Sequence, residues 1–362
     1  MWMRRATFGA AVLAIAFAAR AADAPAPGPW RVFILSGQSN MEGKGSIKHL
    51  EQLLADEKTA PTYRHLRDGD KWAERPDVLI RYTNADKVDK KGPLTVGYAN
   101  PPDRFGVELQ FGNAVGDRLK ERVLLIKVCW GGRSLRFDFR PPSSGPGDFD
   151  ADWLAKTAKR AGWEGDPAKF VGHNYRDLVR LTHETLANLK TLFPEYDGSG
   201  YEIAGFVWFQ GWNDMLDAAH HSEYGPNLAN FLRDLRADLG VPDLPMIVGE
   251  LGQSGTEQQI PERYRGKHMS FRAQQESVSK LPEFKDSVRY VPTGVCMVFD
   301  GPEFDGGYHY RGRADVFFRI GDAFGKAILP LLKPTPTDQA AQIKKAYDAA
   351  WQKYSFAPAP TK

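Results

Sequence analysis

Cysteine is scarce in this chain, which has two of them, Cys129 and Cys296, in 362 residues. A small domain held together by a disulfide framework is therefore excluded. Each cysteine ends or lies within an apolar segment typical of a buried strand, where a free thiol serves as a small hydrophobic side chain more often than as half of a bridge. Although export would permit a disulfide, we expect both thiols to be free.

Excess charge is also lacking. The formal net charge is +3 at pH 7, and Arg4, Arg5 and Arg20 lie within the first 21 residues, which contain no acid. Without that segment the net charge is zero, so the rest of the chain has no basic excess with which to bind phosphate groups. Nucleic acid is therefore not an expected partner, and a polybasic lipid anchor is equally unsupported.

A long apolar segment is lacking too, because the apolar stretch over residues 6–19 is too short to span a bilayer comfortably. It follows a short basic segment and precedes Ala19-Arg20-Ala21, which fits a small-x-small cleavage site. This is the pattern of a signal peptide. We expect cleavage near Ala21 and a secreted or periplasmic protein with no stable membrane anchor; an uncleaved anchor is the alternative interpretation.

An α/β fold is indicated by short apolar segments that alternate with helical patterns. The apolar segments are rich in β-branched and aromatic residues, as strands covered on both faces must be. They are residues 31–36, 123–128, 203–209, 246–250 and 295–299, with an additional strand over 78–82. Helical spacing covers residues 106–121, 175–192, 227–239, 268–281 and 314–329. This alternation predicts a three-layer α/β/α domain with a central, mainly parallel sheet.

We expect this domain to span residues 30–333, after a signal peptide over 1–21 and a Pro/Ala-rich linker over 22–29. The remaining residues, 334–362, are expected to form one helix over 335–354, packed across the outside, and a short tail.

Parallel sheets bind their ligands at the carboxyl ends of the strands, so the residues that follow each strand are the candidates for a site. Ser39 follows the first strand after Gly37, which permits a tight exit from it. The serine is a candidate nucleophile, and a helix N-cap is the alternative. The G-x-S-x-G elbow of α/β-hydrolases is absent.

Two further segments after strands carry groups that could stabilise an oxyanion. Gly131 and Gly132 would let backbone N–H groups approach a ligand. A phosphate-binding loop is the alternative interpretation, but the Gly-Lys-Ser/Thr that such a loop requires is missing. Gln210 and Asn213 follow the third strand and could each donate an amide hydrogen bond, as an acyl-transfer oxyanion requires. An ordinary Asn-Asp turn is the alternative for Asn213.

A histidine, His309, lies between the last predicted strand and a helix, with several acids just before it. A serine nucleophile needs a base of near-neutral pKa that is oriented by a carboxylate. A solvent-exposed histidine without function is the alternative. Taken together, the four segments supply the parts of one esterase site.

The same four segments resemble the signature blocks of the SGNH-hydrolase superfamily. In detail they are similar to the sialate O-acetylesterase and acetyl-xylan-esterase branch, which is like carbohydrate esterase family six. The most specific piece is Gly37-Gln38-Ser39-Asn40-Met41. The resemblance extends over residues 31 to 330, through segments 33–41, 104–112, 130–135, 208–211 and 308–312.

The resemblance implies roles for these residues. Ser39 would attack the acetyl carbonyl of a carbohydrate, and His309 would take the proton of the serine and return it to the sugar hydroxyl. The backbone N–H groups of Ser39 and Gly132, joined by the side chain of Gln210 or Asn213, would hold the oxyanion. No metal or organic cofactor is expected, and the sequence has no HExxH or paired-cysteine pattern either.

The catalytic acid is where the chain departs from the resemblance. Relatives carry Gln-Gly-Glu in the third block, where this chain has Trp212 in place of the glutamate. The SGNH aspartate usually precedes the histidine by three positions, whereas Asp305 precedes His309 by four. Asp305 is the candidate acid. The substitutes are a main-chain carbonyl, which would leave a Ser-His dyad, and three other carboxylates: Asp300, Glu303 and Asp214.

The expected partner is an acetylated carbohydrate. Trp130, Trp212 and Tyr308 are candidate contacts, because aromatic faces suit sugar rings, although such residues more often fill a core. Arg133 could meet an acidic sugar, or pair with Asp138. A non-catalytic carbohydrate-binding protein on the same fold is the alternative function. An esterase for lipids or thioesters is disfavoured, because the long segments 43–77 and 136–172 are polar.

Overall fold

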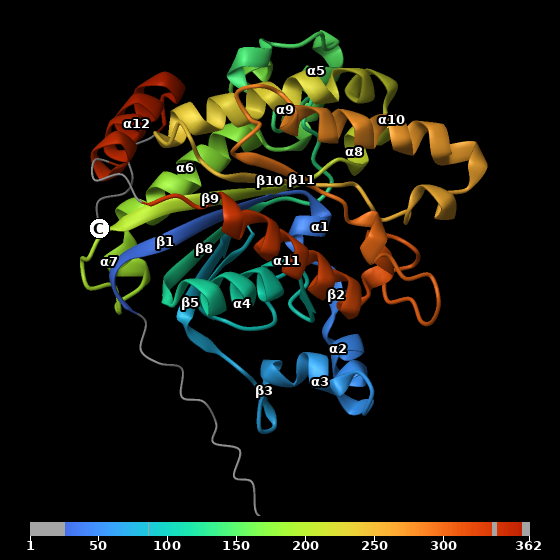
Figure 1. The fold of residues 1–362 in the computed structure, drawn as a ribbon. Coiled ribbons are helices and arrows are strands. Elements are labelled where there is room, and N and C mark those ends of the chain that lie inside the picture. Colours follow the sequence, from blue (N-terminus) through green and yellow to red (C-terminus); the bar gives the residue numbers. More distant parts are fainter. Residues whose placement is uncertain (1–25, 86, 335–338, 357–362) are drawn as a thin grey trace, which may run out of the picture.

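A seven-stranded sheet forms the centre of the computed structural model, which describes residues 26–85, 87–334 and 339–356 (Figure 1). The strand order is β11-β10-β9-β1-β8-β5-β6. All neighbouring pairs are parallel except β5 and β6, so the predicted α/β class and mainly parallel sheet are confirmed. The strands are β1 (Ala26–Gly37), β5 (Arg75–Thr83), β6 (Asp89–Leu94), β8 (Glu121–Cys129), β9 (Tyr201–Phe209), β10 (Met246–Gly249) and β11 (Val288–Val291).

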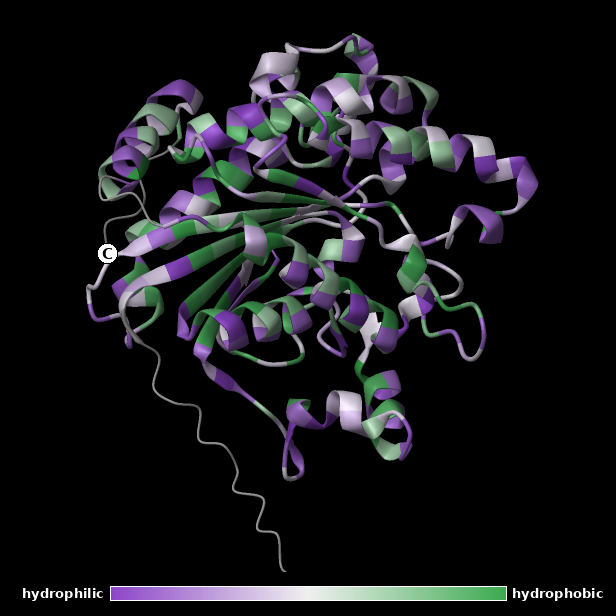
Figure 2. Ribbon diagram, in the orientation of Figure 1, coloured by the Kyte–Doolittle hydropathy of each residue, from purple (hydrophilic) through white to green (hydrophobic). Residues whose placement is uncertain are grey.

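Helices cover both faces of the sheet. Val32 and Ile34 of β1 point into one core, while Phe33 and Leu35 point into the other, and all four are fully buried. Figure 2 shows hydrophobic stretches along strands of the sheet, as this double burial requires. The first core contains α6 (His173–Ala187), α9 (Ala218–Leu239), α10 (Glu262–Ser279) and α12 (Gln339–Tyr354). The second contains α2 (Ile47–Ala55), α4 (Glu108–Leu119) and α11 (Ala314–Ile328).

The remaining elements are shorter helices and two small pairs of strands. The short helices are α1 (Ser39–Glu42), α3 (Ala60–Tyr63), α5 (Ala151–Arg160), α7 (Leu189–Leu192) and α8 (Trp212–Leu216). Two small antiparallel pairs lie outside the main sheet: β2 (Gly45–Ser46) with β7 (Arg104–Phe105), and β3 (Arg67–Asp68) with β4 (Lys71–Trp72).

The last predicted strand, over residues 295–299, is wrong. Residues 294–296 form a 3-10 turn, and the Val295 side chain is 68% exposed. The last parallel strand is instead β11, at the edge of the sheet, where Arg289 is exposed and Tyr290 only partly buried. Because an edge strand is not covered on all sides, it lacks the uninterrupted apolar run by which the other strands were predicted.

Three boundaries also differ from the prediction. β1 begins at Ala26, inside the expected linker over 22–29. Helix α9 begins at Ala218 rather than near Asn227 and includes Pro226, a residue that normally interrupts a helix. The helix predicted over 175–192 is divided at Asn188 into α6 and α7. The additional strand over 78–82 is confirmed as β5, and the C-terminal helix as α12, which packs on α6 and α9.

Cys129 and Cys296 are both free and buried, as predicted. The expected signal peptide and its cleavage site lie outside the described residues. Among the helices that are described, none is long and apolar enough to cross a membrane.

Candidate active site

Ser39 lies at the carboxyl end of β1, the central strand of the sheet, and is the first residue of the single-turn helix α1. The turn needs glycine at position 37, because a Cβ there would lie 2.1 Å from the carbonyl oxygen of Phe209 at the end of β9. The N-cap of α1 is Gln38, so the N-cap alternative for Ser39 is wrong. The serine is 8% exposed.

Gln38 fastens the segments after β1 and β9 to each other. Its Oε1 accepts a hydrogen bond from the Gly211 N–H at 3.2 Å, and its Nε2 donates to Asn213 Oδ1 at 3.1 Å. Asn213 Nδ2 in turn donates to the Gly132 carbonyl at 2.8 Å. Because its oxygen is occupied by Gln38, the asparagine presents its NH₂ group to the Gly132 side, with one hydrogen left to donate. This role of Gln38 is not evident from the sequence, because its partners are distant in the chain.

Gly132 leaves open space beside these donors. Its φ is +67°, and an added Cβ would meet nothing within 4 Å. The backbone N–H groups of Ser39 and Gly132 make no hydrogen bond in the described part of the chain. Both are therefore available to a bound oxyanion.

Gln210, predicted as a possible oxyanion donor, has its side-chain amide fully engaged by other groups. It is 2% exposed, and its Nε2 donates to the Arg133 carbonyl at 2.9 Å and to Asp214 Oδ2 at 2.6 Å. Its Oε1 accepts from the Tyr224 hydroxyl. Both amide hydrogens are thus occupied, and of the two amides predicted as oxyanion donors only Asn213 has one to spare.

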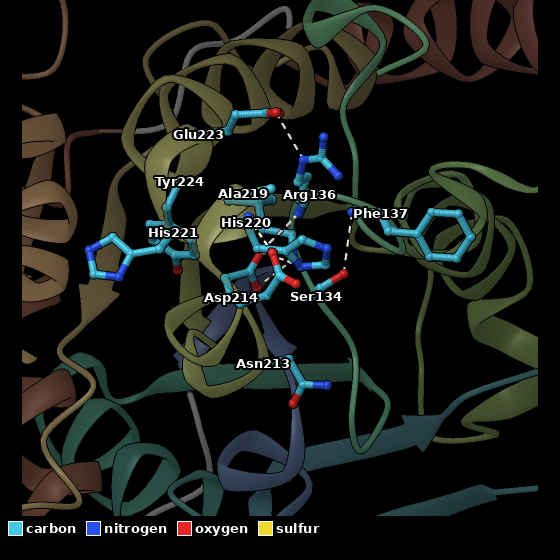
Figure 3. A network of polar contacts seen from close by, with 12 residues as sticks. Ser134, Arg136, Phe137, Asn213, Asp214, Ala219, His220, His221, Glu223 and Tyr224 are labelled. Atoms are coloured by element: carbon cyan, nitrogen blue, oxygen red, sulfur yellow. Dashed lines mark hydrogen bonds and ion pairs between the residues drawn. The ribbon is translucent and has the colours of Figure 1, made fainter. Parts of the chain in front are cut away.

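Asp214 is a fully buried carboxylate that holds the segment after β8 in place. It accepts hydrogen bonds from the N–H groups of Leu135 at 2.8 Å and Arg136 at 3.0 Å, in addition to that from Gln210. Burial raises its pKa to about 7, against the opposing effect of these hydrogen bonds. Figure 3 shows Asn213 pointing away from this network, which includes His220, whose Nδ1 lies 3.7 Å from Asp214 Oδ1. Asp214 is therefore engaged away from His309.

Asp305 forms a hydrogen bond to Nδ1 of His309 through its Oδ2. Both side chains are partly exposed, at 32% and 27%. The other nearby candidates are placed differently: Glu303 pairs with Arg311 at 2.7 Å, and Asp300 is exposed. Among the carboxylates considered as the acid, Asp305 is the one in contact with His309.

Two glycines explain how the four-residue spacing is accommodated. Gly306 and Gly307 have φ values of +53° and +83°, which L-amino acids with a side chain rarely adopt. The turn closes with a hydrogen bond from the Tyr308 N–H to the Asp305 carbonyl at 2.9 Å. The extra residue is absorbed in this turn, so the aspartate and the histidine still meet.

The backbone of the histidine itself is strained. His309, Tyr310 and Arg311 have φ values of +46°, +54° and +61°, and each costs about 1–2 kcal/mol for a residue other than glycine. The fully buried Tyr310 anchors this turn: its hydroxyl lies 2.6 Å from Thr293 Oγ1 and accepts from the Gly252 N–H at 3.0 Å. Three consecutive strained residues at a histidine indicate a position held for function.

The segment after β10 connects this turn to the neighbourhood of Ser39. Gly252 bonds Tyr310, and the adjacent Gln253 accepts a hydrogen bond from Asn40 Nδ2 at 3.0 Å. No hydrogen bond joins Ser39 to His309 within the described residues. Such contacts are commonly long in an enzyme without substrate and tighten when the substrate binds.

A cavity of about 790 Å³, which we term the aromatic pocket, lies among the segments after β9, β10 and β11. It is lined by Trp212 and by Tyr308, which is 59% exposed, together with polar side chains such as Gln253. Trp130 is only 8% exposed and donates its indole N–H to the Asn84 carbonyl, so it forms part of a wall.

Arg133 pairs with Asp138 at 3.1 Å, the alternative considered for it, while one third of its side chain stays exposed. Across residues 26–85, 87–334 and 339–356, no group of three or more His, Cys, Asp or Glu is arranged to hold a metal ion.

Residues 29–285 match the protein family described as carbohydrate esterase, sialic acid-specific acetylesterase. The chain belongs to this family. It is accordingly an ester hydrolase, and by family a carbohydrate acetylesterase. The matched residues contain Ser39, Gly132 and Asn213 and end before Asp305 and His309.

Three individual proteins are similar to this chain. A probable carbohydrate esterase of Arabidopsis thaliana is 27% identical over 242 residues, which are 64% of this chain and 73% of the relative. The X-ray structure of an Arabidopsis thaliana protein covers 83% of this chain and 98% of its own, with 21% identity and a TM-score of 0.48. The crystal structure of a carbohydrate acetylesterase from Xanthomonas citri covers 82% and 55%, with 12% identity and a TM-score of 0.49.

Proposed function

We propose that this carbohydrate esterase removes O-acetyl groups from an acetylated polysaccharide or sialic-acid-type glycan through a Ser39-His309-Asp305 mechanism. The observation that carries the proposal is the hydrogen bond between Asp305 and His309 Nδ1, made despite the unusual spacing. A carboxylate on one ring nitrogen fixes the tautomer in which the other can accept a proton. This favours the esterase over a non-catalytic binding protein, which has no need of an oriented imidazole.

In the first half of the reaction, Ser39 Oγ attacks the acetyl carbonyl carbon while His309 Nε2 takes the hydroxyl proton. The negative charge that develops on the carbonyl oxygen is held by the N–H groups of Ser39 and Gly132 and by Nδ2 of Asn213. When the tetrahedral intermediate collapses, His309 returns the proton to the departing sugar oxygen. Water then hydrolyses the acetyl-serine by the same sequence, with His309 as its base, and releases acetate.

The carbohydrate is held by the residues that surround this centre. Trp212 and Tyr308 directly neighbour Asn213 and His309 in sequence and line the aromatic pocket, where their faces suit a sugar ring. Arg133, next to Gly132 in sequence, contributes a partly exposed guanidinium to a separate cavity. Gln210 stays out of the reaction and positions the Arg133 backbone instead.

Export is part of the same proposal, on the strength of the basic, apolar and Ala19-Arg20-Ala21 pattern over residues 1–21. Sequencing the N-terminus of the protein from its native cells tests it. A mature chain that begins near Ala22 supports export, and an intact Met1 on a cytoplasmic protein contradicts it.

The decisive experiment for the reaction is acetate release from a panel of acetylated glycans, with Ser39→Ala as the matched control. We expect the variant to fold normally and to lose several orders of magnitude in rate, because only binding and the oxyanion donors remain. A variant that keeps more than a few per cent of the activity would overturn the role of Ser39. Glycan binding without acetate release by the wild type would establish the binding protein instead.

A further inference from the structure

A second cavity lies on the other side of Ser39 from the aromatic pocket. It measures about 540 Å³ and is formed by segments that follow β1, β5 and β8, including Glu42, Asn84 and Gly131. In the sheet, β8 and β5 lie on one side of β1, whereas β9, β10 and β11 lie on the other. The two cavities are therefore formed by segments from opposite sides of β1, the strand that ends beside Ser39. We term the second one the cationic pocket.

Its lining carries an excess of positive charge. The side chains of Lys87, Arg133 and Arg160 are cationic, and Glu42 is the one carboxylate among the lining residues described, which leaves two positive charges in excess. The ion-pair partners do not change this excess, because Lys44 beside Glu42 and Asp138 beside Arg133 carry opposite charges. In a chain whose net charge without its first 21 residues is zero, this concentration is local.

These cations have charges and hydrogen-bond donors that are not paired within the described residues. Lys87 and Arg160 are exposed and form no ion pair within the described residues. Arg133 Nε is buried and has no hydrogen-bond acceptor in the described structure, although another nitrogen of the same guanidinium meets Asp138. The lone carboxylate, by contrast, is already neutralised: Lys44 Nζ lies 3.2 Å from Glu42 Oε2.

The floor of the pocket is closely packed. A Cβ on Gly131 would lie 2.8 Å from Glu42 Oε2, so the glycine backbone packs directly against that side chain. The indole of Trp130 is fixed by its 3.0 Å hydrogen bond to the Asn84 carbonyl. A fixed wall of this kind lets the cations on the rim discriminate between ligands by position as well as by charge.

We propose that the cationic pocket is a subsite for a sugar carboxylate, so that the preferred substrate carries a uronic acid beside the acetylated residue. This inference rests on the proposed acetylesterase function. Guanidinium groups match the planar, bidentate geometry of a carboxylate. Helix α5 contributes Arg160, its last residue, to the pocket, so the anion would be bound by side-chain cations rather than by the backbone N–H groups of a helix N-terminus.

The test compares two esters that differ only in this charge. One is an acetylated oligosaccharide with a uronic acid next to the acetylated sugar; the other is the same compound with the carboxyl group reduced to the alcohol. We expect the wild type to prefer the acidic ester on the order of tenfold in kcat/KM, because Lys87 and Arg160 are exposed and the ion pairs that they would form are individually weak. The preference should decrease with added salt.

The variant is Lys87→Gln with Arg160→Gln, and the matched control is Lys159→Gln, an exposed cation of the same helix that does not line the pocket. The double variant should lose the preference for the acidic ester and hydrolyse the reduced ester at the wild-type rate. The control should behave as the wild type on both esters.

The two proposals fail in different ways. Equal hydrolysis of both esters by the wild type, or equal losses on both in the double variant, overturns the subsite while the acetylesterase function stands. A higher rate on a sulfated analogue than on the uronate overturns the carboxylate assignment. Absence of acetate release from every acetylated glycan overturns the proposed function together with the inference built on it.

Discussion

The imidazole of His309 has one ring nitrogen hydrogen-bonded to Asp305, which leaves the other available for proton transfer. If Asp305 orients the ring, Asp305→Asn should lower kcat by a factor on the order of 10⁴, because both the tautomer and the charged form of the imidazole lose their partner. Steady-state acetate release measures this loss. Glu303→Gln is the matched control: it removes a carboxylate of the same loop that pairs with Arg311, and it should leave kcat nearly unchanged.

If Asp305→Asn retains most of the wild-type kcat, the Asp305 hydrogen bond is structural, and the base is oriented by a main-chain carbonyl or needs no orienting group. Equal losses in Asp305→Asn and Glu303→Gln would point to the loop conformation as the cause. Comparing the unfolding transitions of Asp305→Asn and Glu303→Gln with that of the wild type shows whether a loss of activity comes from a defect in folding.

Asn213 is the side chain with an amide hydrogen to spare beside Gly132. Asn213→Ala should therefore lower kcat by a factor of about 10²–10³ with little change in KM. The reason is that the oxyanion develops in the transition state and is absent from the bound substrate. Rates with saturating and limiting ester separate the two parameters. An unchanged kcat would mean that the backbone N–H groups of Ser39 and Gly132 suffice for the oxyanion.

At the scale of single elements, the strand ends bring the site together through backbone contacts that tolerate no side chain. Gly37→Ala would place a Cβ 2.1 Å from the Phe209 carbonyl oxygen, so β1 and β9 would have to separate. We expect a loss of about 1–3 kcal/mol in the free energy of unfolding, together with a loss of activity. Urea unfolding monitored by tryptophan fluorescence measures the first quantity.

Gly266→Ala is the control for this substitution. Gly266 lies inside α10, and an added Cβ meets nothing within 4 Å. Alanine should stabilise this helix by up to about 1 kcal/mol. A Gly37→Ala protein as stable as the wild type would show that the contact between the ends of β1 and β9 relaxes without cost.

The elements differ in how far the sequence predicted them. β1, β8, β9 and β10 are covered on both faces, and their apolar segments correctly predicted them as strands. β11 is an edge strand interrupted by Arg289 and Tyr290, so its composition resembled a loop, while the apolar residues 295–299 form no strand. Ser39 was predicted from its place after a strand that the structure contains. His309 was predicted from its place after residues 295–299, which form no strand, and Asp305 from the resemblance to a known family. Gln38 and Asp214 owe their roles to partners far away in the chain, which spacing alone does not reveal.

At the scale of the whole molecule, the central strand places the serine between two pockets of different character. The sheet order separates the aromatic pocket, at β9 to β11, from the cationic pocket, at β8 and β5. The same packing that builds these walls buries titratable groups. Burial lowers the pKa of several histidines, and that of His268 beside Trp212 to about 4, helped by the positive charges of Arg272 and Lys267.

The lowered pKa of His268 makes folding stability depend on pH. The unfolded chain, with a histidine pKa near 6.5, binds a proton between pH 6.5 and 4 that the folded chain does not bind. The stabilisation is therefore complete above pH 6.5 and is lost as the pH falls toward 4, by at most about 3 kcal/mol for this one group. The raised pKa of Asp214 acts in the opposite direction, because the folded chain then binds the extra proton below pH 7.

Comparison of variants isolates the contribution of His268 from these other groups. Between pH 7 and pH 4.5, His268→Gln should lose less stability than the wild type, since the glutamine has no proton to gain. Ser254→Ala is the matched control: it removes the hydroxyl 3.5 Å from His268 Nε2 but keeps the imidazole, and should retain the wild-type dependence. Thermal unfolding of the three proteins across this pH range measures the difference. Parallel curves for His268→Gln and the wild type would contradict the assignment, and the loss of stability in acid would then come from the remaining buried histidines.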